Sequence, residues 1–158
     1  MKELILKNID FDLYYNSVNL LDTLNTRNKM YYDLLFRWIK NKNKNRNICD
    51  WLIKNGISRI GIYGAGNLGE LLFSEIINCT NIKISYVIDK NNFNNNLKKI
   101  PIIKFEQITD FEKVDCIIVT PIYAYEEIKV NLEAIGIEKV ICLDEIIFEL
   151  NIEEGESK

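Results

Sequence analysis

The chain has 158 residues, of which 47% are apolar and 27% are charged, with a formal net charge of −3 and no histidine. This length predicts one domain with a small appendage, and the apolar share is sufficient for a packed core. The negative charge argues against general nucleic-acid binding, and the lack of histidine excludes imidazole zinc sites and Ser-His or Cys-His nucleophile pairs.

The sequence also predicts the cellular location of the protein. Charged residues, and not a long apolar core, occupy the N-terminus, so no signal peptide is expected. No apolar run reaches the roughly 20 residues that span a bilayer. The basic run 40–46 is expected to be a solvated helix end and connector. We therefore expect a cytoplasmic protein that binds neither nucleic acid nor membrane.

Four cysteines are scattered along the chain without C-x-x-C spacing: Cys49, Cys79, Cys116 and Cys142. In a cytoplasmic protein such residues pack as small apolar side chains. We expect all four to be reduced.

Residues 1–56 are predicted to form a helical extension, because apolar residues recur near helical spacing and no glycine precedes Gly56. The polar stretch 25–29 interrupts the pattern, which leaves two helices as an alternative to one. A short helix over 47–55 follows, with Asn47 as its N-cap. The aromatic and leucine side chains of the extension predict either packing or a homodimer surface.

From Ile57 to Leu150, strands and helices alternate, which predicts a Rossmann-like α/β fold with a doubly wound parallel sheet. Strands are expected at 59–63, 83–88, 100–103, 115–120 and 139–143. Helices are expected at 67–78, 123–135 and 144–150, with a helix or turn at 105–113, a surface loop at 91–96 and a frayed acidic tail at 151–158. The predicted strand order is 3-2-1-4-5.

A glycine-rich turn joins the first strand to the first helix of this core, with the spacing Gly64-x-Gly66-x-x-Gly69. Gly64 permits a tight bend, Gly66 lets a diphosphate approach bare backbone, and Gly69 lets the helix pack close to the strand. Free N–H groups at the helix start favour an anion. The predicted nucleotide contacts are Gly64, Ala65, Gly66, Asn67, Leu68 and Gly69. The alternative is a turn that keeps its glycines for packing and holds no ligand.

Asp89 ends the second predicted strand, about 20 residues beyond Gly69 as the dinucleotide-binding pattern requires. A carboxylate there accepts hydrogen bonds from ribose hydroxyls and repels a 2′-phosphate, so NAD is favoured over NADP. The alternative is an Asx-turn residue that opens the Asn-rich loop.

Thr120, Pro121 and Tyr123 follow the fourth predicted strand, beside the point where the strand order reverses. Ligands of open α/β sheets bind in that crevice, so a hydroxyl or ring there is expected to contact a sugar or base. Alternatively, Thr120 and Pro121 only end a strand and start a helix.

Three segments resemble the small Rossmann-like domains of bacterial surface-polysaccharide biosynthesis: IGIYGAGNLG at 60–69, YVID at 86–89 and DCIIVTP at 115–121. Similar domains precede the β-helix of sugar O/N-acyltransferases, end sugar C-methyltransferases and begin membrane-linked nucleotide-sugar dehydratases. The resemblance covers 57–150 and implies a site for NAD or a nucleoside-diphosphate sugar. The catalytic parts of those proteins have no counterpart in this sequence, so a binding module without its own complete catalytic set is expected.

Two other functions remain open. Tyr125 and Lys129 have the Tyr-x-x-x-Lys spacing of short-chain dehydrogenases and nucleotide-sugar epimerases, which implies a minimal oxidoreductase or epimerase with Tyr123 or Tyr125 as proton donor. However, the pair follows the fourth strand, whereas that family places it after a later one. The third hypothesis is an interaction or scaffold protein with an empty Rossmann-like site.

Overall fold

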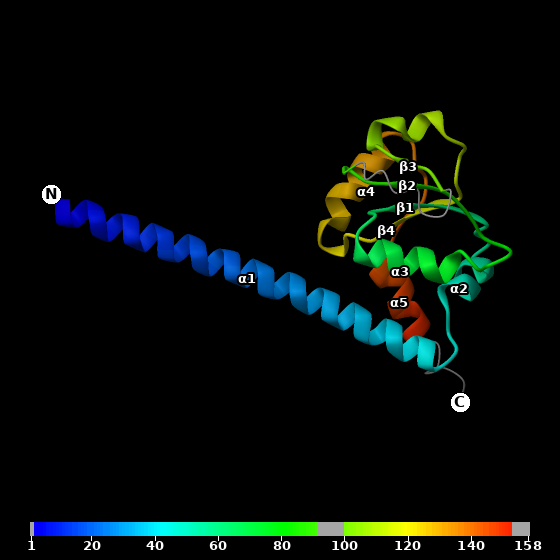
Figure 1. The fold of residues 1–158 in the computed structure, drawn as a ribbon, viewed down its shortest axis with the longest axis horizontal. Helices are drawn as coiled ribbons and strands as arrows, with labels where there is room; N and C mark the ends of the chain where they lie inside the picture. Colours follow the sequence, from blue (N-terminus) through cyan, green and yellow to red (C-terminus); the bar gives the residue numbers. More distant parts are fainter. Residues whose placement is uncertain (1, 92–99, 153–158) are drawn as a thin grey trace. The chain divides into compact units, whose positions relative to one another are not determined.

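The protein is described from a computed structural model that defines residues 2–91 and 100–152, with side chains from Leu13 onward (Figure 1). The chain forms two compact units, Met1–Phe36 and Arg37–Lys158. The expected loop 91–96, apart from Asn91, and the end of the expected acidic tail lie outside the described residues.

The first helix, α1, is continuous over Lys2–Asn43, so the polar stretch 25–29 does not divide it into two. Hydroxyl side chains in this region donate to the carbonyl four residues earlier, as Ser17 and Thr26 do at 2.7 and 2.9 Å. Such bonds satisfy the side chains within the helix and leave its backbone ladder intact. Residues up to Phe36 form the first unit, and the last turns of α1 belong to the second.

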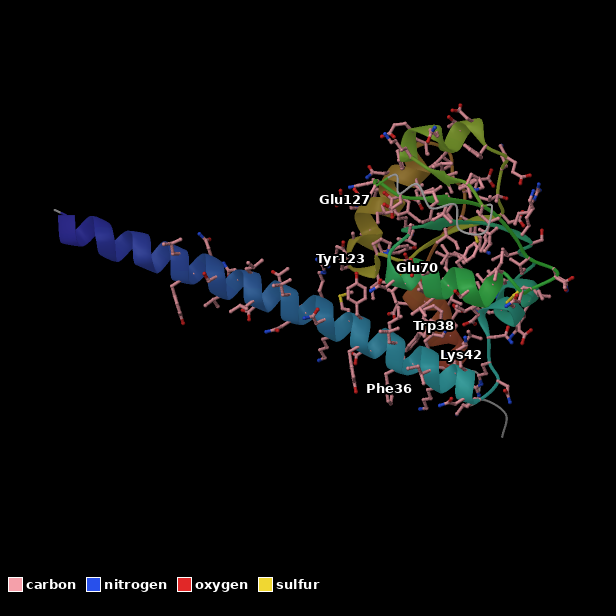
Figure 2. The ribbon with its side chains drawn as sticks, in the orientation of Figure 1. Phe36, Trp38, Lys42, Glu70, Tyr123 and Glu127 are labelled. Carbon is pink, nitrogen blue, oxygen red and sulfur yellow. A yellow bond between two sulfur atoms is a disulfide. The ribbon has the colours of Figure 1, made fainter. Side chains whose placement is uncertain are left out.

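The second unit begins earlier in the chain than the expected boundary at Gly56, because Glu75 ties the preceding segment to the core. Trp38 Nε1 and Lys42 Nζ reach one carboxylate oxygen of Glu75, at 2.8 and 3.1 Å, and the Ile48 N–H reaches the other at 2.8 Å. Figure 2 labels Trp38 and Lys42. The acceptor lies on helix α3 (Asn67–Ile76), and Ile48 begins helix α2 (Ile48–Lys54). Asn47 caps α2 as expected, by accepting from the Asp50 N–H.

Five parallel strands form one sheet in the order β3-β2-β1-β4-β5, which confirms the predicted α/β fold and strand order. The strands are β1 (Arg59–Tyr63), β2 (Lys83–Ile88), β3 (Ile102–Ile103), β4 (Cys116–Val119) and β5 (Val140–Cys142). In the sheet centre, Ile62 pairs with Val87 on one side and Ile118 on the other. Every residue of β4 is buried, as expected for a strand covered on both faces.

One face of the sheet packs under helix α4 (Tyr125–Ala134), with Ile128 and Leu132 in its buried cluster. Gly61 makes this packing possible, because a Cβ at that position would lie 2.7 Å from Cε2 of Tyr86. Figure 1 shows α2, α3 and α5 (Leu143–Ile152) gathered together beside the sheet. The expected helix 123–135 is α4, which the short 3-10 helix η2 (Ile122–Ala124) precedes. The expected helix or turn at 105–113 is a shorter 3-10 helix, η1 (Phe105–Asp110).

Cys49 and Cys79 form a disulfide, with their Cα atoms 6.3 Å apart, so the expectation of four reduced cysteines is wrong for this pair. Thirty residues separate them in sequence. They meet because α2 packs on α3. Cys116 and Cys142 are free thiols, and burial raises the pKa of Cys116 to about 12. In the described part of the chain, no helix combines the length and apolar character needed to cross a bilayer.

Candidate functional site

The glycine turn has the geometry that its spacing predicts. Gly64 has φ +100°, which L-residues rarely adopt, and a Cβ there would lie 2.5 Å from Thr120 Oγ1. A Cβ on Gly69 would collide with the carbonyl oxygen of Gly64. Gly64 therefore makes the bend, and Gly69 allows helix α3 to start directly against it.

Gly66 differs from the other two, because no described residue beyond its chain neighbours lies within 4 Å of the position its Cβ would take. It is the N-cap of α3, with extended backbone (φ −74°, ψ −171°) and no side-chain cap. The first N–H groups of a helix have no partner inside it, and the helix dipole favours negative charge there. Among the predicted contacts, Gly66 and Asn67 are exposed while Ala65 and Leu68 are half-buried. The turn thus exposes the backbone of Gly66 and Asn67 at the start of α3.

Asp89 connects the end of β2 to this turn. Its Oδ2 accepts from the Ala65 N–H at 2.7 Å, and its Oδ1 accepts from the Asn91 N–H at 2.8 Å. The second bond is the Asx turn considered as the alternative role for Asp89. Each oxygen retains acceptor capacity, since a carboxylate has about four lone-pair sites. The carboxylate is therefore fixed in position and still able to accept from a ligand.

Thr120 supports the turn from below. Its hydroxyl donates to the carbonyl oxygens of Tyr63 at 3.0 Å and Gly64 at 3.3 Å, and only 3% of the residue is exposed. The hydroxyl is thus occupied by the backbone that leads into the bend. Pro121 and Tyr123, which follow Thr120 in the chain, line the pocket at this edge of the sheet.

A pocket of about 810 Å³ opens at this carboxyl edge of the sheet. Of the predicted site residues it brings together four: Gly64, Asp89, Pro121 and Tyr123. The other six, Ala65, Gly66, Asn67, Leu68, Gly69 and Thr120, do not line it. The glycine turn therefore borders the pocket mainly through Gly64.

Ten further residues line the pocket and were not predicted from the sequence: Tyr63, Lys90, Asn91, Lys104, Phe105, Glu106, Ala124, Glu127, Ile128 and Asn131. Three of them could have been predicted from their positions in the sequence. Tyr63 ends β1, Lys90 follows the end of β2, and Lys104 follows β3 directly. The carboxyl ends of parallel strands share one edge, so these residues had to lie near the predicted ligand. The positions of Glu127 and Asn131 could not be predicted in this way, because both lie within helix α4. Figure 2 labels Glu127 on α4 and Tyr123 on η2.

The pocket contains three carboxylates and two lysines, so its charge is mixed with an excess of negative groups. Burial raises the pKa of the Tyr63 hydroxyl, and the charges of Asp89, Glu127 and Glu106 raise it further. Tyr63 is therefore a neutral hydrogen-bonding group at physiological pH.

Tyr125 lies outside this pocket. Its hydroxyl donates to the Val140 carbonyl at 3.1 Å, and burial is the main cause that raises its pKa to about 12. Lys129 Nζ lies over the Tyr125 ring, 5.8 Å from its centroid. Within residues 2–91 and 100–152, no group of three His, Cys, Asp or Glu side chains is arranged to hold a metal ion.

A parallel α/β sheet with a glycine turn and a crevice at its carboxyl edge defines the chain as a doubly wound α/β protein with a ligand-sized pocket. Residues 56–142 match the family described as C2185-like, N-terminal, and the chain belongs to this family. The match extends from Gly56 through β5, so it includes the whole sheet and every pocket residue. No curated protein matches the sequence.

Proposed function

We propose that the chain is a cytoplasmic nucleotide-binding module that holds NAD or a nucleoside-diphosphate sugar and serves sugar or surface-polysaccharide metabolism. It does so without a complete catalytic set of its own. The observation that carries this proposal is the glycine turn, with Gly66 uncovered, beside a pocket of about 810 Å³. Pockets of this size hold small molecules and cofactors in other proteins.

The proposed ligand lies across the turn. Its diphosphate meets the N–H groups around Gly66 and the start of α3, where backbone donors and the helix dipole favour an anion. Its ribose hydroxyls donate to the remaining lone pairs of Asp89. The rest of the nucleotide enters the pocket between Pro121 and the end of β3.

Gly66→Ala tests this placement. The methyl group meets no described residue beyond its chain neighbours, and an alanine N-cap costs about 1 kcal/mol, so the variant folds. The added methyl occupies the space through which a diphosphate approaches the backbone. Asn78→Ala, an exposed change just beyond α3, is the control.

Thermal unfolding is measured with NAD, NADP, UDP-sugars and S-adenosylmethionine. We expect NAD or a nucleotide-sugar to raise the Tm of the wild type and of Asn78→Ala, and to leave Gly66→Ala unchanged. If none of these compounds shifts the wild-type Tm at millimolar concentration, the proposal is wrong.

A minimal NAD-dependent oxidoreductase or epimerase is the second candidate, with Tyr123 as its proton donor. One observation favours it: Tyr123 lines the pocket and is 48% exposed. The version with Tyr125 is weaker, because the Tyr125 hydroxyl is bonded to Val140 and Lys129 lies over its ring. NADH absorbance with nucleotide-sugars, in wild type and Tyr123→Phe, is the test; an activity that persists in Tyr123→Phe excludes this role.

We also propose that α1 forms a homodimer surface, whether or not the pocket is filled. Six large apolar side chains of the first unit are exposed along one stretch of helix: Leu13, Tyr14, Tyr15, Leu20, Leu21 and Leu24. Exposed apolar groups gathered in this way are typical of protein interfaces. If the pocket proves empty, this surface is what remains of the scaffold hypothesis.

A further inference from the structure

Three carboxylates and the hydroxyl of Tyr63 lie in the pocket. Asp89 follows β2, Glu106 belongs to η1 and Glu127 belongs to α4, so three separate elements supply the acids. Their charges converge on Tyr63, the last residue of β1. Tyr63 lines the pocket and is only 9% exposed, and its hydroxyl has no hydrogen-bond partner among residues 2–91 and 100–152.

Two of the three carboxylates, those of Glu106 and Glu127, have hydrogen-bonding capacity that the described residues do not use. In the described part of the chain, neither Glu106 nor Glu127 makes a hydrogen bond or an ion pair, whereas Asp89 already holds two backbone N–H groups. An ionised carboxylate only accepts hydrogen bonds. Lys90 and Lys104 offset part of the charge, but the acids outnumber them. The occupant of this region therefore has to bring donors.

The place of these acids identifies the part of the ligand that meets them. With a diphosphate at Gly66 and a ribose at Asp89, the region between η1 and α4 is left for the nucleobase. Phe105 and Ile128 line this region and supply apolar surface for a ring. The base edge then meets Glu106, Glu127 and the amide of Asn131, which lies one turn after Glu127 on α4.

Nucleobases differ in what they offer to carboxylates. Adenine and cytosine carry an exocyclic amino donor, and guanine carries N–H and NH₂ donors side by side. Uracil carries one N–H between two carbonyl acceptors. A carboxylate gains a charge-assisted bond from an amino group and is repelled by a carbonyl oxygen.

We propose that this pocket selects a nucleotide whose base carries an exocyclic amino group, and discriminates against uridine nucleotides. The inference rests on the proposed nucleotide-binding function and narrows it. NAD, through its adenine, and sugar nucleotides of adenine, guanine or cytosine are favoured, and UDP-sugars are not.

ADP, GDP, CDP and UDP share one diphosphate and one ribose, so titration of the full chain with each by calorimetry isolates the base. We expect at least one amino-bearing nucleotide to bind at least about tenfold more tightly than UDP. Glu127→Gln and Glu106→Gln reduce that ratio, because an amide also donates to uracil carbonyls. Glu126→Gln is the matched control: Glu126 is exposed on the same helix, does not line the pocket, and its variant keeps the wild-type ratio.

The outcomes separate the two proposals. If UDP binds as tightly as the three other nucleotides, base selection is refuted while nucleotide binding stands. If the ratio is unchanged in both glutamine variants of the pocket, these acids do not select the base. If none of the four nucleotides binds, the inference falls together with the proposed function.

Discussion

The backbone N–H of Ala65 donates to Oδ2 of Asp89 at 2.7 Å, so the end of β2 holds the glycine turn that follows β1. At the opposite edge of the sheet, Asp115 Oδ2 makes comparable bonds with the N–H groups of Ser58 and Arg59, both at 2.8 Å. The two aspartates thus perform the same structural task on either side of β1, and only Asp89 does so in the pocket.

Comparing substitutions of Asp89 and Asp115 distinguishes an effect on stability from an effect on nucleotide binding. In Asp89→Asn, one of the two backbone donors meets an NH₂ group, so we expect a loss of about 1.5–3 kcal/mol of unfolding free energy. Nucleotide affinity falls at least about tenfold, because the ribose loses a charged acceptor. Asp115→Asn, with a smaller loss because its site is exposed, keeps the wild-type affinity. Urea unfolding and calorimetry measure both; equal affinity losses in the two variants would exclude a direct ligand contact by Asp89.

Gly69 and Gly66 are expected to respond oppositely to alanine. At Gly69 the new methyl overlaps the Gly64 carbonyl oxygen, a backbone atom that cannot move without opening the turn. We expect Gly69→Ala to lose at least about 3 kcal/mol, the upper range for overpacking. Gly66→Ala has free space and is expected to retain almost all of its stability. A chemical denaturation curve for each variant checks this, and a stable Gly69→Ala would show that α3 does not have to start so close to β1.

The sheet and its order could be predicted from the sequence because the chain alternates regularly between apolar runs and turn signals. Strand β1 has the expected bounds, Arg59–Tyr63, since glycine ends it sharply. Strand β3 is shorter than expected, Ile102–Ile103, and pairs in register with Val87 and Ile88 of β2. The tight bend at Gly64 and the close helix packing at Gly69 follow from steric rules, so both could be predicted from the sequence.

The pocket walls could be predicted only in part. Glu106 and Glu127 lie in helical elements, and their patterns along the chain are those of exposed helix positions. They face one cavity only because η1 and α4 follow strands on either side of β1. The disulfide was missed for a related reason: a separation of 30 residues carries no signal until α2 packs on α3. Contacts between segments that are distant in the sequence were therefore the part of the structure that could not be predicted.

Acid is expected to destabilise the protein through two carboxylates at the amino edge of the sheet. Hydrogen bonds from Lys83 and Ser85 lower the pKa of Glu112, and the N–H groups of Ser58 and Arg59 lower that of Asp115 from its ordinary 3.8. Because both folded pKa values lie below the unfolded ones, the stabilisation is fully present above the unfolded pKa. It is lost as the pH falls through the folded pKa.

Urea midpoints measured from neutral pH down to about pH 3 test this predicted loss of stability in acid. The double variant Glu112→Gln, Asp115→Asn lacks both titrating groups, so its stability is expected to fall less steeply with pH than that of the wild type. Identical slopes for the two proteins would mean that other carboxylates cause the acid sensitivity.

The Cys49–Cys79 disulfide is expected to contribute about 3–4 kcal/mol, the chain-entropy value for a loop of 30 residues. Reductant therefore lowers the Tm of the wild type, while Cys49→Ser starts lower and does not respond to reductant. Cys142→Ser, which changes a free thiol, keeps the full response to reductant. Thiol titration of the denatured, unreduced protein gives two free cysteines if the disulfide is present and four if it is not.

The exposed apolar side chains of α1 predict self-association. Leu20 and Leu24 are 61% and 41% exposed and stand four residues apart, on one side of the helix. Burying a leucine against a second copy contributes about 1.5–3 kcal/mol, so Leu20→Glu with Leu24→Glu is expected to weaken a dimer at least about a hundredfold. The control is Asn16→Glu with Asn19→Glu, which adds the same charge at exposed polar positions of the same helix. Sedimentation equilibrium distinguishes the variants: we expect dimers for wild type and control and monomers for the leucine variant, and a monomeric wild type at all concentrations rules out the dimer surface.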